Sequence, residues 1–176
     1  IPGGELDQDE DAPPLVTRAA RCSASDPFAA PVPVLGLETI DGTARFSSDE
    51  LSVVFSNRGT DGLIDLYQAS RASKAERFRN PKALEGLAVV EGTKLFPSIA
   101  QDNLTLWFAQ SHNTPSGYRV DIVSARRASE AASFEVVEAG AALNVFRENT
   151  TPFVAKHAPE LWYAAGPSSE TYELFV

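Results

Sequence analysis

Hydrophobic and polar positions along this chain follow a pattern that occurs three times. Three strongly apolar runs each close on an aromatic residue, namely Phe55, Phe108 and Tyr163. Nine residues before each aromatic stands another apolar residue, and turn-forming residues lie between the two, at 48–50, 101–103 and 157–159. Short apolar runs bounded by turn residues are typical of paired strands. Each copy therefore predicts a strand, a tight turn and a second strand.

A third strand is predicted after each of these pairs, over residues 64–69, 120–125 and 171–176. An acidic residue opens each of them, at Asp65, Asp121 and Glu173. A second spacing supports the same periodicity, since an arginine stands seven residues before a phenylalanine in three places: Arg21 and Phe28, Arg71 and Phe78, and Arg127 and Phe134. Three matching copies of two independent spacings indicate an internal repeat.

The length of the repeat points to one all-β architecture. Phe55 and Phe108 are 53 residues apart and Phe108 and Tyr163 are 55 apart, and such periods favour a β-propeller or a related array. The second strands are apolar on consecutive residues, which predicts cover on both faces. Their aromatic residues are interpreted as core: Phe55, Trp107, Phe108, Trp162 and Tyr163. The Ala/Glu-rich stretch 128–142 falls in a loop and an outer strand of the repeat, so no helix is expected there.

Composition narrows the classes of partner. The 176 residues are enough for one domain with a core, and the formal net charge is −9. Nucleic acid and anionic membrane surfaces attract basic proteins, so neither is an expected partner. No apolar run is long enough to cross a bilayer, and no membrane insertion is expected.

The first fourteen residues are acidic and flanked by Pro and Gly, and we expect a flexible leader over 1–14. Asp7, Asp9 and Asp11 alternate like the first ligands of a calcium loop. The remaining positions do not fit, because Ala12 replaces the turn glycine and Arg18 the bidentate glutamate. A solvated tail is the favoured interpretation, and no metal or cofactor is predicted.

The repeat resembles the TolB-type β-propeller family of bacterial periplasmic and secreted proteins. The resemblance rests on Ser56-Asn57-Arg58, on Asp65-Leu66-Tyr67 and on Arg71-Ala72-Ser73 in the first copy, and on Asp26-Pro27-Phe28 before it. It covers about 155 residues and implies four-stranded antiparallel blades and a periplasmic or secreted location. The second copy departs from the pattern at Gln110-Ser111-His112 and the third at Gly166-Pro167.

The resemblance divides residues 15–176 into blade segments. These are an outer strand and linker at 15–42, with the strand within 29–35, one blade at 43–93, a second at 94–149, and the inner three strands of another at 150–176. Three blade equivalents are too few to close a ring, since propellers have four to eight blades. We therefore expect either a homodimer forming a six-bladed ring or a second polypeptide that completes it.

Candidate chemistry is sparse, and no catalytic residue is assigned. Cys22 has no accompanying hydrolase signature and is interpreted as an unreactive loop thiol. His112 and His157 fall in different classes of loop, so a shared metal site is not expected. Asp65, Asp121 and Glu173 recur in every copy, which is typical of residues that build the repeat, and Asp65 is expected to pair with Arg58.

Recognition is expected in the segments that differ most between the copies, at 57–63, 110–119 and 165–170. Six residues in the first two segments are predicted to bind a ligand: Arg58, Asp61, His112, Asn113, Tyr118 and Arg119. The sequence favours a non-enzymatic module that binds a protein or a glycan through loops at one end of the ring. The alternative is a propeller hydrolase or lyase whose active site is completed by other blades or another chain.

Overall fold

A computed structural model describes residues 30–137, 142–155, 160–168 and 170–176. The chain divides into two compact units, 1–32 and 33–176, and the strands described below all belong to the second. Predictions for the leader, the Asp7–Asp9–Asp11 series, Cys22, Arg21, Phe28 and His157 fall outside the described residues.

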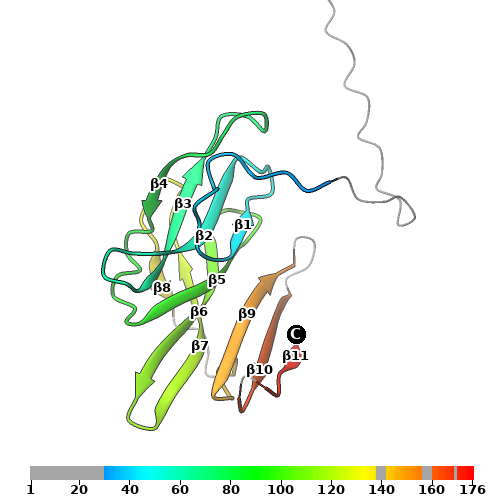
Figure 1. Cartoon of the computed structure of the whole chain (residues 1–176). Helices are drawn as coiled ribbons and strands as arrows, with labels where there is room; N and C mark the ends of the chain where they lie inside the picture. The colour runs from blue at the N-terminus through cyan, green and yellow to red at the C-terminus, as the bar shows by residue number, and fades with distance from the viewer. Residues whose placement is uncertain (1–29, 138–141, 156–159, 169) are drawn as a thin grey trace, which may run out of the picture. The chain divides into compact units, whose positions relative to one another are not determined.

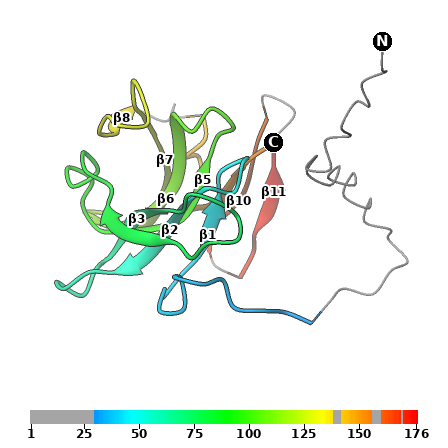
Figure 2. The same cartoon turned by 90° about the horizontal axis from the view of Figure 1, so that it is seen from above.

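The all-β prediction is confirmed, and the strands follow one another as three antiparallel meanders (Figures 1 and 2). The first meander contains β1 (Ala44–Phe46), β2 (Ser52–Arg58), β3 (Ile64–Ser70) and β4 (Arg79–Ala83). The second contains β5 (Thr93–Ile99), β6 (Thr105–Thr114), β7 (Gly117–Arg126) and β8 (Glu135–Val137). The third contains β9 (Glu148–Val154), β10 (Leu161–Gly166) and β11 (Glu173–Phe175).

The meanders are grouped into two sheets. The first meander is a four-stranded antiparallel sheet, and the other two form a seven-stranded mixed sheet. A single parallel pairing, Val120 with Glu148, joins the second meander to the third. The strands of the described residues form no closed ring. The periodic strand positions predicted from the sequence are nevertheless present, and residues 128–137 contain no helix.

Side-chain packing alternates from one face of each sheet to the other. Val54 on β2 packs toward the second meander, in a buried cluster with Leu66 and Phe108. Phe55, the next residue, packs on the opposite face with Leu37 and Phe78. Both faces of β2 are therefore covered, as its consecutive apolar residues predict.

The third meander differs in this respect. Tyr163 is buried against Ile122 of the second meander, together with the half-buried Trp107. Trp162 points to the other face and is 37% exposed. Its prediction as a core residue is wrong, because no described residue covers that face of the third meander. Phe55, Phe108 and Tyr163 are buried as predicted.

The seven-residue spacing between arginine and phenylalanine has a direct structural cause. The guanidinium carbon of Arg71 lies 4.5 Å from the ring centroid of Phe78, and that of Arg127 lies 4.6 Å from the ring of Phe134. In both meanders the arginine Nε donates a 2.9 Å hydrogen bond to a carbonyl in the turn between the first two strands, at Glu50 and Asn103. We call this end of each meander the arginine end.

A second repeated element lies in the segments that lead into the first and the second meander. Gly36 and Gly86 have φ values of +89° and +86°, and a Cβ atom on either would lie about 2 Å from the carbonyl oxygen of Phe78 or Phe134 respectively. The leucine after each glycine is buried in the same cluster as that phenylalanine. Only glycine fits such an approach, so the linker is fixed against the arginine end.

Residues 30–35, the described part of the predicted outer strand, are exposed and form no strand. Leu35 is linked to the first meander by a 2.9 Å hydrogen bond from the Phe78 amide to the Leu35 carbonyl. An outer strand needs a neighbour to pair with, and none of the described strands pairs with this segment.

Candidate functional site

The six predicted binding residues lie at the end of the meanders opposite the arginine end, which we call the hairpin end. Arg58 closes β2 and Asp61 lies in the β2–β3 turn. The other four lie on the β6–β7 hairpin: His112 and Asn113 on β6, and Tyr118 and Arg119 on β7. Among the described residues, no hydrogen bond or ion pair joins the first group to the second.

The stretch 110–119 is not the long loop expected from the sequence. β6 and β7 have ten residues each and are joined by a two-residue turn, Pro115-Ser116. The Thr114 hydroxyl donates a 2.8 Å hydrogen bond to the Gly117 carbonyl, and Gly117 has a φ of +109°. A tight turn with glycine at a positive φ extends the ladder to its tip, so the polar residues stand on a rigid hairpin.

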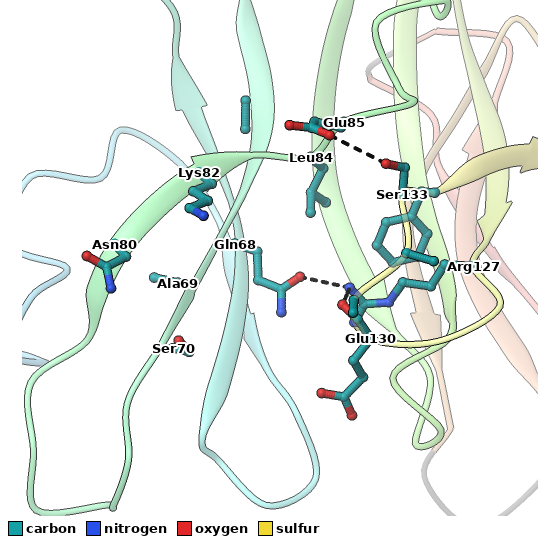
Figure 3. A pocket seen from close by; sticks show the side chains of 14 residues that line it. Gln68, Ala69, Ser70, Asn80, Lys82, Leu84, Glu85, Arg127, Glu130 and Ser133 are labelled. Atoms are coloured by element: carbon teal, nitrogen blue, oxygen red, sulfur yellow. Dashed lines mark hydrogen bonds between the residues drawn. The ribbon is translucent and has the colours of Figure 1, made fainter.

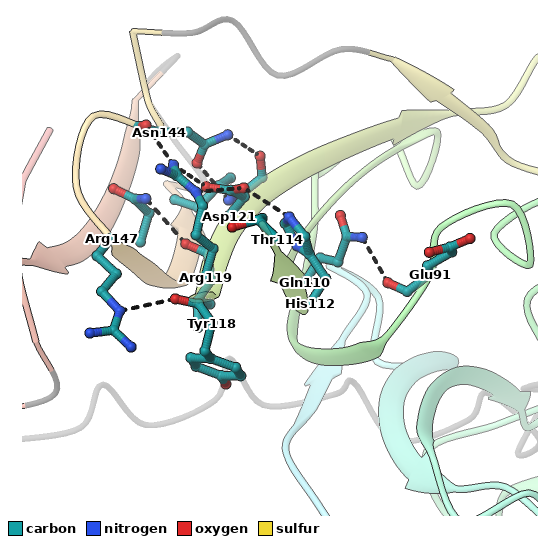
Figure 4. A network of polar contacts seen from close by, with 12 residues as sticks. Glu91, Gln110, His112, Thr114, Tyr118, Arg119, Asp121, Asn144 and Arg147 are labelled. Atoms are coloured by element: carbon teal, nitrogen blue, oxygen red, sulfur yellow. Dashed lines mark hydrogen bonds and ion pairs between the residues drawn. The ribbon is translucent and has the colours of Figure 1, made fainter. Parts of the chain in front are cut away.

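Strand alternation brings four polar side chains to one face of this hairpin. Arg119 and Asp121 are two residues apart on β7, and their cross-strand partners on β6 are His112 and Gln110. Arg119 donates a 2.8 Å hydrogen bond to Asp121, and His112 Nε2 lies 3.6 Å from the same carboxylate (Figure 4). The structure therefore brings together two of the predicted residues, His112 and Arg119, around Asp121.

The electrostatics of this cluster are dominated by the arginine. The hydrogen bond that Arg119 donates to Asp121, together with the negative charge of that carboxylate, raises the pKa of Arg119 above its usual value against the opposing effect of burial. The other ring nitrogen of His112, Nδ1, is buried without a hydrogen-bond partner. Asp121 therefore accepts a hydrogen bond from Arg119 while the His112 ring lies beside the same carboxylate.

The cluster also anchors the linker to the third meander. The Arg119 guanidinium donates to the carbonyl oxygens of Asn144 and Phe146, at 3.1 and 3.3 Å. Arg147 returns a 2.9 Å hydrogen bond to the Tyr118 carbonyl. The part of the hairpin next to its turn is thus tied to residues 144–147, which holds the exposed Arg147 beside it (Figure 4).

These contacts create an exposed patch made of Asn113, Tyr118, Arg147 and Tyr172, which we call the tyrosine patch. Both tyrosine side chains are more than two-fifths exposed. Tyr172 donates a 2.5 Å hydrogen bond to Glu148. Partial burial, this hydrogen bond and the neighbouring Glu148 and Tyr118 raise the pKa of Tyr172 to about 12. The patch joins the β6–β7 hairpin to the third meander.

Arg147 and Tyr172 were not predicted from the sequence. Arg147 lies in the linker after an outer strand, where the repeat gives no register. Tyr172 was assigned to a strand of the repeat, but β11 begins one residue later, at Glu173. The one available signal was that neither residue has an equivalent of the same type in the first copy.

Arg58 and Asp61 make contacts within the β2–β3 turn and next to it. Arg58 donates to the Gly62 carbonyl at 2.8 Å and pairs with Asp41 at 3.3 Å, with both side chains more than half exposed. Asp61 accepts a 3.0 Å hydrogen bond from the Leu63 amide. These are turn-closing contacts of the kind that Asp commonly makes.

The expected pair of Asp65 with Arg58 is wrong. In the β2–β3 ladder Asp65 is opposite Asn57, and Arg58 is opposite Ile64. Side chains of successive residues alternate between faces, so Arg58 and Asp65 point to opposite sides of the sheet.

Asp65 instead pairs with Lys94 of the second meander, at 2.6 Å. The Lys94 side chain is buried, and this ion pair crosses between the two meanders. The sequence contained a signal for it, because Lys94 is the only charged residue in the strand Thr93–Ile99. A buried lysine needs a partner of opposite charge, and the repeat supplies an acidic residue at the start of the preceding third strand.

A groove of about 390 Å³ separates β3 and β4 from the β7–β8 loop (Figure 3). Arg127 and Gln68 point toward each other across it and form a 3.1 Å hydrogen bond. Burial lowers the pKa of Arg127, and the nearby carboxylates of Glu130 and Asp102 oppose that shift. The charges lining the groove are balanced, with Lys82 and Arg127 against Glu85 and Glu130, so it offers no selectivity for an ion of either sign.

The described residues hold no group of three or more His, Cys, Asp or Glu side chains placed to bind a metal ion. No helix in the described part of the chain is long and apolar enough to span a membrane. Comparison of the chain with family models, curated proteins and solved structures finds no significant match.

Proposed function

We propose that this chain is a β-propeller binding module that recognises a protein or a glycan through its hairpin end. The repeated meanders support the propeller arrangement, because each packs face to face on the next and each has its strands in the predicted order. The periplasmic or secreted location implied by the sequence resemblance is part of this proposal.

The tyrosine patch is the observation that carries the proposal. Tyrosine and arginine are the residue types enriched where proteins bind one another, because they combine a large apolar area with hydrogen-bonding groups. Here both types are exposed and also held in place, Arg147 through the Tyr118 carbonyl and Tyr172 through Glu148. A site held rigid before binding loses less entropy when its ligand arrives.

The enzymatic alternative has one observation in its favour, the proximity of His112 to Asp121. A general base must be accessible to the substrate, whereas His112 Nδ1 is buried and Asp121 is already engaged by Arg119. The geometry therefore supports binding better than catalysis by this chain.

The test is a glycan array and a displayed peptide library, each probed with the 176-residue protein and with the variants Tyr118→Ala and Arg147→Ala. Val137→Ala is the matched control, because Val137 on β8 is 42% exposed and Tyr118 is 44% exposed. We expect a ligand class whose binding falls about tenfold or more in the patch variants, the size expected for one important interface residue, and is unchanged in the control. Ligands that bind all four proteins equally, or no ligand in either screen, would contradict the proposal.

A further inference from the structure

The third meander carries an uncovered apolar face whose equivalents are covered in the other two meanders. The residue after the acidic opener of the third strand is buried in the first two copies, with Leu66 1% and Ile122 0% exposed, but Leu174 is 69% exposed. Together with Thr151, Phe153 and Trp162, Leu174 lines a shallow apolar groove. In the first two meanders, the next meander covers the corresponding face.

The same meander also has an open strand edge. A fourth strand follows in the first two meanders, since β4 pairs with β3 and β8 pairs with β7. Among the described strands, β11 pairs only with β10. An unpaired edge presents backbone donors and acceptors that can accept another strand.

Residues 30–35 match the fourth strand of the first meander, β4. Gly36 stands eight residues after Phe28, as Gly86 stands eight residues after Phe78, and in this alignment Pro31 is equivalent to Pro81 in β4. The sequence Pro31-Val32-Pro33-Val34 also fits an outermost strand. Alternate residues of a strand direct their amides to the same side, so both prolines can face solvent while Val32 and Val34 pair inward.

We propose that residues 30–35 of a second copy of this chain add to β11 as the fourth strand, antiparallel to it. The first meander of that copy then covers the groove around Trp162 and Leu174. The inference rests on the proposed propeller arrangement. It assigns an occupant to both open features of the third meander at once, and in a two-fold dimer each copy completes the other.

The chain's own geometry favours a second copy over closure within one chain. Leu35 is held against Phe78 of the first meander by a backbone hydrogen bond, and Leu37 is buried beside the same phenylalanine. The first and third meanders pack against the second through separate clusters, one around Phe108 and the other around Ile122. The second meander therefore lies between the anchored end of the segment and β11.

The first measurement is the solution mass of the full chain by light scattering. We expect twice the chain mass of 18.9 kDa. Leu174→Asp places a charge in the proposed contact, and we expect at least a tenfold loss of dimer affinity with an unchanged circular dichroism spectrum. A chain that stays monomeric at all concentrations up to about 100 µM would overturn the proposal. A stable homodimer with an interface of standard size would already have assembled at that concentration.

A cross-linking experiment identifies the segment. Two differently tagged chains, both carrying Cys22→Ser, are co-expressed, one with Val32→Cys and the other with Val176→Cys, and are then oxidised; the alignment places Val32 opposite Val176, as Lys82 is opposite Gln68 in the first meander. We expect a disulfide-linked pair containing both tags. Val89→Cys in place of Val32→Cys is the control, because Val89 is 77% and Val32 is 81% exposed, and we expect no linked pair.

Two results would contradict the assignment. Equal cross-linking of the Val89 control would show that the contact is not specific to the segment. A cross-link within one chain, in a monomeric double variant with both Val32→Cys and Val176→Cys, would show closure by the chain itself. Neither result bears on ligand binding, which the Tyr118 and Arg147 variants test separately.

Discussion

The first and second meanders are alike at one end and different at the other. At the arginine end the first and second meanders are built alike, down to the arginine over the phenylalanine, the carbonyl it binds and the glycine packed beneath. At the hairpin end they differ in strand length, in turn and in charge. β2 and β3 have seven residues each, whereas β6 and β7 have ten and carry the tyrosine patch.

This difference separates residues that stabilise the fold from residues whose side chains are available to bind a ligand. A side chain that every copy uses in the same contact is explained by that contact. The side chains of the tyrosine patch have no such repeated partner, and several are exposed. The expected consequences of substitution therefore differ between the two ends, in stability at one and in binding at the other.

The largest expected loss of stability is for a glycine at the arginine end, compared with a glycine of similar backbone conformation at the hairpin end. Gly86→Ala at the arginine end would place a Cβ 1.8 Å from the Phe134 carbonyl oxygen, whereas Gly62→Ala in the β2–β3 turn meets no atom within 4 Å. We expect Gly86→Ala to lower the free energy of unfolding by about 4 kcal/mol or more. Gly62→Ala should lower it by about 1 kcal/mol, which is the cost of placing alanine in a left-handed backbone alone. Urea denaturation measures both. Equal losses would mean that the close approach at Gly86 contributes nothing.

The next effect concerns the ion pair that crosses between meanders. Asp65→Asn leaves the buried Lys94 without a counter-charge, and we expect a loss of about 2–3 kcal/mol, below the usual range for a buried pair because Asp65 is partly exposed. Lys94→Met removes the buried charge instead, and we expect a change within about 1 kcal/mol. Urea midpoints at constant m-value report the difference. A larger loss for Lys94→Met than for Asp65→Asn would contradict this account.

A smaller loss of stability is expected when the arginines of the arginine end are replaced, and it should be larger for Arg127 than for Arg71. Arg127→Lys removes hydrogen bonds to the Asn103 and Glu130 carbonyls and to Gln68, in a buried site. We expect a loss of about 2 kcal/mol there, and about 1 kcal/mol for the more exposed Arg71→Lys. Thermal or urea unfolding gives the order. A reversed order would show that the contact across the groove to Gln68 adds no stability.

The smallest effect on stability lies at the hairpin end and depends on pH. With its pKa raised from 10 to about 12, folded Tyr172 keeps a proton that the unfolded chain has lost in this interval. Its contribution to stability is therefore complete below pH 10 and is lost as the pH rises toward 12. The difference in absorbance titration between wild type and Tyr172→Phe should have a midpoint near 12. Glu148→Gln should lower that midpoint, and an unchanged value would exclude the role assigned to Glu148.

The order and places of the strands could be predicted because the repeat sets them. Phe55, Phe108 and Tyr163 mark the buried second strands, and the acidic residues mark the third. The sequence could not show that Trp162 is exposed, since its pattern is the same as that of Trp107. What differs is whether another meander covers it, which is a property of the neighbouring surface and not of the strand.

The site was predicted only in part, for two physical reasons. Asp65 was expected to pair with Arg58 because a repeated acidic residue was taken to bond the arginine of its own copy, but the cross-strand register places the two side chains on opposite faces. His112 and Arg119 were expected in a loop, and their meeting at Asp121 depends on the ladder continuing to Thr114. Arg147 and Tyr172 join the patch through tertiary contacts between the second and third meanders, for which no spacing along the chain gives a signal.

The single backbone pairing between Val120 and Glu148 has a consequence for how the chain comes apart. Hydrogen-bonded backbone ladders are almost confined within meanders, so the coupling between meanders passes mainly through side chains, by packing, by side-chain hydrogen bonds and by the Asp65–Lys94 ion pair. Such a chain resembles a row of locally folded units with nearest-neighbour coupling. The third meander is held on one face only, and it is the unit expected to open first and to exchange its amide protons while the other two remain closed.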